Sequence, residues 1–180
     1  MGRRFIPTPD SRLLTSMTCY LSLGSNLGDR VANLRRALRM LGEAGAKIRR
    51  VSSFYKTEPV DFRPQPWFVN CVAEADTELT PLRLLKTIKS IEREMGRQPG
   101  RPKRPRPIDI DILLYDNVVK RSSAMTIPHE RLAERRFVLV PLQELEPTVR
   151  HPITGRTVLE MLGDTRDASR VVKLKDNDER

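Results

Sequence analysis

The sequence is poor in the residues that mark disulfide-stabilised, metal-cluster and membrane-spanning proteins. It contains two cysteines, two histidines and one tryptophan, and aromatic residues make up 5% of its 180 positions. Cys19 and Cys71 each lie in an apolar, strand-like run, which predicts two buried, reduced thiols rather than a disulfide or a metal site. No apolar run approaches the roughly 18 residues that a transmembrane helix needs, and the N-terminus lacks the apolar region of a secretory signal. We therefore expect a cytoplasmic protein that does not bind membranes.

Positive charge, by contrast, is abundant. Lys and Arg number 33 against 23 Asp and Glu, and the net charge of +10 favours polyanionic partners such as nucleic acids or phosphorylated metabolites. The length suits one hydrophobic core. We expect a single domain over residues 18–170, followed by a polar tail over residues 171–180. Residues 1–17 show no periodicity and are predicted to be an extension that is disordered or not native, with Met17 as the alternative start.

Hydrophobic periodicity predicts the element order β-α-β-β-α-β. The predicted strands cover residues 18–23, 47–55, 68–75 and 108–115, and the predicted helices cover residues 31–41 and 81–95. Thr80 and Pro81 fit the N-cap and first position of the second helix. This order matches an α+β, ferredoxin-like plan, in which both helices pack on one face of an antiparallel sheet.

Shorter elements follow this core. We expect a turn at residues 127–129, a short helix near Arg131, an apolar segment over residues 137–142, and a last helix near residues 158–162 that Thr157 caps. They are C-terminal additions to the predicted plan.

The most informative segment is Ile108-Asp109-Ile110-Asp111-Ile112, inside a predicted strand. Because side chains alternate along a strand, the isoleucines share one face and the two carboxylates share the other. Carboxylates about 7 Å apart repel each other unless a cation lies between them, and hard oxygen ligands favour Mg²⁺. Taken alone, such a pair fits an exposed strand face at least as well.

A dense basic segment precedes these acids. Its cations are Arg97, Arg101, Lys103, Arg104 and Arg106, and four prolines between residues 99 and 107 keep it out of helix and strand. Acids that bind a metal beside bases that bind phosphate are typical of phosphoryl transfer. The basic segment alone fits a nucleic-acid-binding loop equally well.

Three further features bear on ligand binding. The turn at residues 24–29 lacks the Gly-Lys-Ser/Thr ending of a Walker phosphate loop. Phe68 and Asn70 share a strand face and fit a planar heterocycle, although a core phenylalanine beside a satisfied amide is the commoner arrangement. His129 follows Pro128 and is a potential phosphate contact.

Six short segments, separated along the chain, together form a recognisable pattern. They are residues 21–28 (Leu-Ser-Leu-Gly-Ser-Asn-Leu-Gly), 52–59 (Ser-Ser-Phe-Tyr-Lys-Thr-Glu-Pro), 68–70 (Phe-Val-Asn), 108–113 (Ile-Asp-Ile-Asp-Ile-Leu), 127–129 (Ile-Pro-His) and 135–137 (Arg-Arg-Phe). In order and spacing they resemble the 6-hydroxymethyl-7,8-dihydropterin pyrophosphokinase family, over residues 18–162. The resemblance implies transfer of pyrophosphate from ATP to 6-hydroxymethyl-7,8-dihydropterin, giving AMP and the pterin diphosphate, in folate biosynthesis. We also expect a monomer that binds no nucleic acid, since the paired acids would repel a phosphate backbone.

The resemblance further implies roles for individual residues. Asp109 and Asp111 would hold two Mg²⁺ ions, and with Arg97 and Arg106 they would form the catalytic set. The pterin would contact Thr57, Pro59, Val60, Phe68, Asn70 and Phe137. ATP would contact Arg97, Arg106, Ile112, Thr126, His129 and Arg135.

One segment departs from the family pattern. Lys103-Arg104-Pro105-Arg106 stands where the family usually shows Trp-Gly-Pro-Arg, which predicts a lid that seals less well and releases product faster. Two other classes of function fit parts of the sequence. A nucleic-acid-binding module fits the charge, although the paired acids oppose it, and an inactive relative serving as an interaction domain fits the altered loop.

Overall fold

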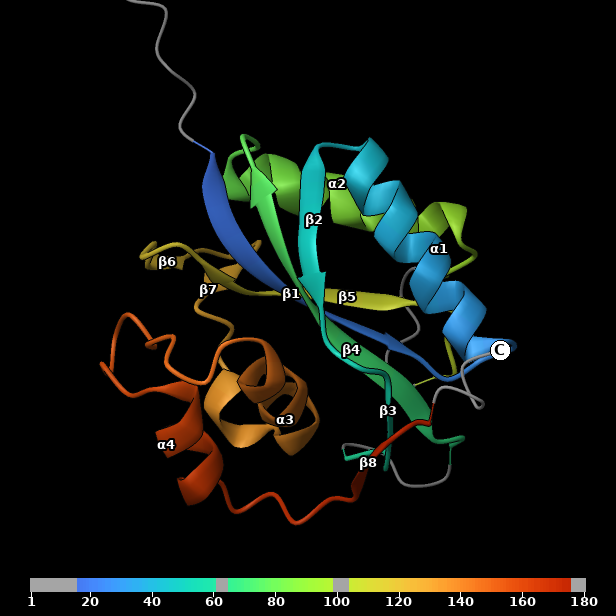
Figure 1. Ribbon diagram of the computed structural model, residues 1–180. Coiled ribbons are helices and arrows are strands. Elements are labelled where there is room, and N and C mark those ends of the chain that lie inside the picture. Colours follow the sequence, from blue (N-terminus) through green and yellow to red (C-terminus); the bar gives the residue numbers. More distant parts are fainter. Residues whose placement is uncertain (1–15, 61–64, 99–103, 176–180) are drawn as a thin grey trace, which may run out of the picture.

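The computed structural model describes residues 16–60, 65–98 and 104–175, and its centre is an antiparallel sheet (Figure 1). Its six strands are β1 (Met17–Ser25), β2 (Ala46–Val51), β3 (Tyr55–Thr57), β4 (Phe68–Thr77), β5 (Asp109–Tyr115) and β8 (Val171–Lys173). They are ordered β5-β1-β4-β3-β8, and β2 pairs with the other half of β4. The predicted α+β, ferredoxin-like plan is confirmed.

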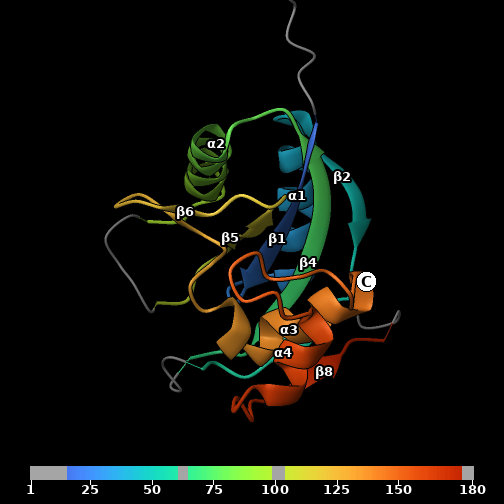
Figure 2. The ribbon, with the colours of Figure 1, turned by 90° about the vertical axis from the view of Figure 1, so that its left-hand side faces the viewer.

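Two helices cover one face of the sheet, α1 (Arg30–Glu43) and α2 (Pro81–Glu94) (Figure 2). Each repeats apolar residues at helical spacing, so that Leu34 and Leu41 of α1 and Ile88 of α2 are fully buried against the odd-numbered residues of β1. Asp29 caps α1 by accepting a hydrogen bond from the Ala32 amide at 3.0 Å. The predicted N-cap Thr80 precedes α2 but makes no side-chain capping bond.

Three C-terminal helices lie against the opposite face, the short 3₁₀ helix η1 (Leu132–Glu134), α3 (Arg136–Leu145) and α4 (Val158–Asp164) (Figures 1 and 2). The hairpin strands β6 (Lys120–Arg121) and β7 (Thr126–Ile127) lie beside β5, and Ile127 packs in the core that α1 and α2 cover. Leu139 and Leu142 of α3 pack on Tyr20 and Val72, which point away from α1 and α2. Thr157 and Glu160 form a complete capping box on α4, as the sequence predicts for Thr157.

The predicted strand over residues 47–55 is two strands. Ser52 separates them: its hydroxyl accepts the Val72 amide at 3.0 Å, while its own amide donates to the Val72 carbonyl at 2.9 Å. Glu144 of α3 then accepts hydrogen bonds from the Ser53 amide, the Ser53 hydroxyl and the Tyr55 hydroxyl. The interruption is therefore built from side-chain hydrogen bonds that hydrophobic periodicity does not detect.

The C-terminal segment also differs from expectation. Residues 171–173 fall within the predicted polar tail, yet they form β8, in which Val171 lies opposite Thr57. Lys173 adds an ion pair to Glu144 at 3.1 Å. At the other end, Met17 opens β1 opposite Thr77, and residues 1–15 of the predicted extension lie outside the described residues.

The two cysteines are buried and unbridged, which confirms the predicted thiols. Burial raises the pKa of Cys19 to about 12, with a smaller contribution from Asp76, so the thiol stays protonated at neutral pH. In the described part of the chain, no helix is long and apolar enough to span a membrane. The cytoplasmic location stays a prediction.

The packing of α3 on the sheet predicts how much stability is lost when its buried Leu139 side chain is shortened. Leu139→Ala should lower the free energy of unfolding by about 2–5 kcal/mol, because a fully buried side chain leaves a cavity beneath the helix. Leu159→Ala, in α4, is the matched control: Leu159 is 55% exposed, and the change should cost less than about 0.5 kcal/mol. Urea denaturation of both variants checks this, and equal midpoints for the two would contradict the packing described.

Candidate active site

A cavity of about 340 Å³ opens on the sheet face that α1 and α2 leave uncovered. Strand alternation supplies its floor, because Ser22 and Gly24 of β1 point to this face while Leu21 and Leu23 point to the helices. The ladder places Gly24 between Asn70 of β4 and Asp109 of β5, and all three line the cavity.

The structure brings together all of the predicted site residues except two. The cavity is lined by Thr57, Pro59, Val60, Phe68, Asn70, Arg97, Arg106, Asp109, Asp111, His129, Arg135 and Phe137, together with residues that were not predicted. Ile112 and Thr126 line a second cavity of about 300 Å³ instead. Asp111 and His129 border both cavities, so the two spaces adjoin.

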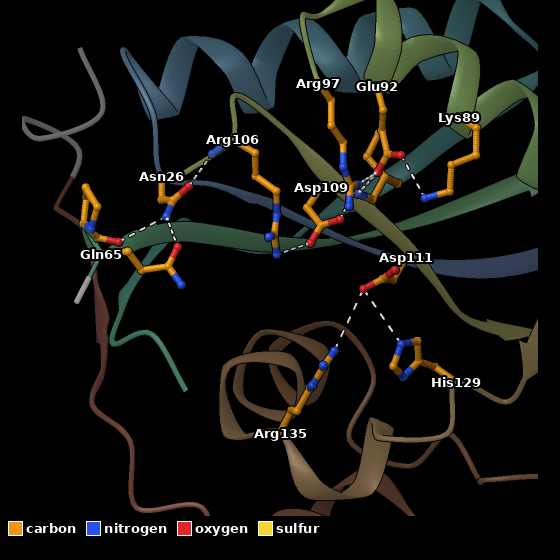
Figure 3. Close-up of polar contacts among 12 residues, drawn as sticks. Asn26, Gln65, Lys89, Glu92, Arg97, Arg106, Asp109, Asp111, His129 and Arg135 are labelled. Carbon is orange, nitrogen blue, oxygen red and sulfur yellow. Dashed lines mark hydrogen bonds and ion pairs between the residues drawn. The ribbon is translucent and has the colours of Figure 1, made fainter. Parts of the chain in front are cut away.

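Asp109 is held by two guanidinium groups (Figure 3). Arg97 Nη1 lies 2.5 Å from Asp109 Oδ1, and Arg106 Nη2 lies 2.5 Å from Asp109 Oδ2. Burial lowers the pKa of Arg97, whereas the negative charges of Asp109 and Glu92 raise it. Together the two carboxylates outweigh burial, so the net shift of the pKa is upward. The guanidinium therefore remains charged inside the site.

Glu92, at the end of α2, supports this pair from behind. Its carboxylate is 2% exposed and contacts Arg97, accepts the Ile110 amide at 2.9 Å, and pairs with Lys89 at 2.8 Å. Because Ile110 lies between Asp109 and Asp111 on β5, one buried carboxylate fixes both the arginine and the strand that carries the acids.

Asp111 is held more loosely than Asp109. His129 Nε2 lies 3.8 Å from its carboxylate and Arg135 Nη1 lies 4.0 Å away, both beyond hydrogen-bonding distance (Figure 3). Burial lowers the pKa of His129 although Asp111 opposes the shift, so the ring is neutral at pH 7. Since His129 Nδ1 accepts the Arg131 amide at 3.1 Å, the proton of the neutral ring is on Nε2.

The other end of the cavity combines aromatic faces with an amide. The Arg106 guanidinium lies 5.4 Å from the Phe68 ring centre, and that of Arg135 lies 5.6 Å from the Phe137 ring centre. The buried Asn70 side chain donates from Nδ2 to Thr57 Oγ at 2.6 Å. A flat ligand with polar edges fits such a lining.

Gly24 is the residue that lets Asn70 reach into the site. A Cβ at this position would lie 2.4 Å from Asn70 Oδ1, closer than real contacts allow. The sequence had placed Gly24 in a turn, but it belongs to β1, and the turn with its positive-φ Gly28 follows. Gly24 therefore allows the Asn70 side chain to approach the β1 backbone closely, and it does not serve to reverse the chain.

The acids do not form a complete metal centre by themselves. In residues 16–60, 65–98 and 104–175, no group of three or more His, Cys, Asp and Glu side chains is arranged to hold a metal. Two neighbouring carboxylates do suit Mg²⁺, which keeps several water or phosphate ligands in its coordination shell. Lys103, the position at which the resemblance leads us to expect tryptophan, lies outside the described residues.

Sequence reasoning missed Ser22, Gly24, Asn26, Gln65 and Glu92. The alternation of β1 would have placed Ser22 and Gly24 beside the acids if the pairing of β1 with β5 had been assumed. Asn26, Gln65 and Glu92 act through contacts between segments that are distant in sequence, and no local pattern marks them.

Paired carboxylates, guanidinium groups and aromatic faces lie together on one side of a ferredoxin-like sheet, and such a set can bind a phosphorylated ligand next to a flat one. Comparison with known proteins agrees with this class. Residues 20–147 match the family model described as 7,8-dihydro-6-hydroxymethylpterin-pyrophosphokinase, and the chain belongs to this family.

Individual relatives extend the comparison. The chain is 42% identical over 143 residues to 2-amino-4-hydroxy-6-hydroxymethyldihydropteridine pyrophosphokinase of Aquifex aeolicus, covering 79% of this chain and 89% of that protein. It is 45% identical over 144 residues to folic acid synthesis protein fol1 of Schizosaccharomyces pombe, covering 79% of this chain but 20% of that protein. The chain therefore spans a fifth of that longer relative.

A solved structure shows the same fold. The wild-type HPPK-DHPS of Plasmodium falciparum, crystallised with pteroate, superposes with a TM-score of 0.67 at 15% identity, over 83% of this chain and 44% of that one.

The close approach at Gly24 generates a prediction. Gly24→Ala should weaken binding of 6-hydroxymethylpterin by about tenfold or more, because the new methyl group displaces the Asn70 amide. Pterin fluorescence titration measures the change. Gly42→Ala, at a helical position with nothing within 4 Å of the added carbon, is the control and should bind like the wild type. Unchanged binding in Gly24→Ala would show that Asn70 does not contact the pterin.

Proposed function

We propose that this chain transfers pyrophosphate from ATP to 6-hydroxymethyl-7,8-dihydropterin, releasing AMP. Family membership supports the proposal, as does the name of the Aquifex aeolicus relative, most of whose length the chain covers. The observation that carries it is that Asp109 and Asp111 share one cavity with three arginines and with aromatic and amide side chains.

The pterin would occupy the aromatic end. Phe68 and Phe137 supply ring faces, and Asn70 supplies an amide edge that Thr57 orients. Stacking and buried hydrogen bonds together favour a flat, amide-rich heterocycle over other small metabolites, since an analogue without matching polar groups would leave Asn70 unsatisfied.

ATP would span the two adjoining cavities. Its base would enter the space that Ile112 and Thr126 line, and its phosphates would pass Asp111 and His129, which border both cavities. The neutral His129 ring presents its Nε2 proton toward that junction, and Arg135 adds a positive charge there. The phosphates would therefore meet hydrogen-bond donors along their path.

Asp109 and Asp111 would hold two Mg²⁺ ions, as the family resemblance implies. Bound Mg²⁺ neutralises phosphate charge and lowers the pKa of an attacking hydroxyl. Both oxygens of Asp109 are paired with arginines in the structure, and Arg97 and Arg106 would exchange this carboxylate for phosphate oxygens when the nucleotide binds. Arg97 and Arg106 would thus have negatively charged partners before and after binding.

The reaction follows from this placement. The pterin hydroxyl oxygen forms a bond to the β-phosphorus, the bond from that phosphorus to the α,β-bridging oxygen breaks, and AMP leaves while the hydroxyl proton passes to water. Phe68, Phe137 and Asn70 hold the acceptor in line, and Arg97 and Arg106 stabilise the developing charge. The proposal needs no dedicated general base.

AMP release is the direct test of the activity. The wild-type protein should release AMP only when Mg-ATP and the hydroxymethyl dihydropterin are both present. Binding of nucleic acid that weakens steeply with salt, without AMP release, would favour the nucleic-acid-binding alternative instead. AMP formation without pterin would indicate a different acceptor.

The carboxylate pair gives the sharpest mutational test. Asp111→Asn keeps the side-chain shape but removes the charge, and it should lower turnover by about a hundredfold or more without lowering stability. Asp116→Asn, just after the same strand at a positive φ of 45° that asparagine tolerates, is the control and should keep wild-type turnover. The rate of AMP formation measures both, and wild-type rates in Asp111→Asn and Asp109→Asn would refute the metal assignment.

A further inference from the structure

A segment near the C-terminus connects two walls of the aromatic end of the cavity. Residues 165–173, which we call the C-terminal strap, lead from the end of α4 to β8 (Figure 1). One wall is the start of α3, which carries Phe137, and the other is formed by residues 57–60. In the described part of the chain the strap does not line the cavity, so it acts on both walls from outside.

Asp167 joins the strap to the first turn of α3. Its Oδ2 accepts the Arg136 amide at 2.8 Å, and its Oδ1 accepts the Ser169 amide at 2.9 Å. The hydroxyl of Thr165 also donates to the Glu134 carbonyl at 3.1 Å. The N-cap side chain of α3 makes no capping bond, so Asp167 supplies from a distant segment the acceptor that a helix start needs. The helix dipole also favours a carboxylate at this end.

The other end of the strap holds the opposite wall. The Arg170 amide donates to the Glu58 carboxylate at 2.9 Å, and the Glu58 amide donates to the Arg170 carbonyl at 3.1 Å. Strand β8 then pairs with β3, where Val171 lies opposite Thr57. Because Thr57 accepts a hydrogen bond from Asn70 and Glu58 lines the cavity, these bonds fix the backbone of the wall that faces the pterin subsite.

We propose that Asp167 is a positioning residue for the pterin, because it ties the strap to the start of α3 and so holds Phe137 at a fixed spacing from residues 57–60. The proposal rests on the proposed function for the identity of the ligand. A flat ring stacks well only when both walls keep their spacing, and a displacement of about 1 Å is costly. The nucleotide end depends on other elements, since Ile112 and Thr126 lie on β5 and β7.

Steady-state kinetics of AMP formation separate this role from general damage to the fold. In Asp167→Ala the KM for the hydroxymethyl dihydropterin should rise about fivefold or more. The KM for Mg-ATP, and kcat at saturating pterin, should each stay within about twofold of the wild type. A residue that only stabilised the fold would instead lower kcat, through loss of folded protein, or leave all three constants unchanged. Either pattern, or an equal rise in both KM values, would overturn the proposal.

Asp164→Ala is the matched control. It makes the same chemical change three residues earlier, at the last residue of α4, where the exposed carboxylate pairs with Arg156. Its KM for the pterin should equal that of the wild type. A rise as large as that in Asp167→Ala would overturn the proposal, because any change at the end of α4 would then have the same effect.

Two variants at Arg170 test the other end of the strap, and they decide the matter if circular dichroism shows that Asp167→Ala does not fold. Proline removes the amide that donates to Glu58, whereas alanine keeps it. Both variants lose the guanidinium that lies 5.2 Å from the Trp67 ring centre, so this contact is matched between them. The KM for the pterin should be about threefold or more higher in Arg170→Pro than in Arg170→Ala. Equal values would overturn the proposal.

Failure of the positioning role is separable from failure of the function. A wild-type protein that forms AMP, together with an unchanged pterin KM in Asp167→Ala, overturns the positioning role alone. A wild-type protein that forms no AMP overturns the proposed function, and with it the identity of the ligand that Asp167 would help to position.

Discussion

Charge compensation around Asp109 is the interaction on which the rest of the site depends. A buried Glu92, a charged Arg97, Asp109 and Arg106 alternate in sign, and they join the end of α2, strand β5 and the segment before β5. An isolated carboxylate at this depth would be costly, so each charge needs its neighbour. The same alternation suits the proposed polyanionic substrate, because guanidinium groups released from Asp109 would meet its negative charge.

The sheet supplies the second constraint. Alternation along β5 buries Ile110 and Ile112 against α1 and α2 and presents Asp109 and Asp111 on the other face. The C-terminal additions then cover only part of that face, since α3 packs on Tyr20 and Val72 and leaves the ends of β1, β4 and β5 open. The cavity lies on the part of this face that α3 does not cover, while the other face of the same strands is packed against α1 and α2.

Local patterns in the sequence predicted those features of the fold that depend on neighbouring residues. They gave the order of the core elements, the acid pair on one strand face and the capping of α4 by Thr157. They did not predict the division between β2 and β3, because Ser52 and Glu144 create it through contacts across the fold. Residues that support the site from outside the cavity were missed for the same reason: burial and partners at positions such as Glu92 depend on tertiary packing that periodicity does not report.

Strand β8 has a practical consequence for work with this protein. It pairs with β3 next to the aromatic end of the cavity, and Arg170, just before it, lies 5.2 Å from the Trp67 ring centre. Met17, by contrast, starts β1 at the end remote from Gly24 and the cavity (Figure 1). A fused domain that disturbed the pairing of β8 would disturb the strand next to the aromatic end of the cavity, whereas one attached before β1 would lie next to the remote end of that strand.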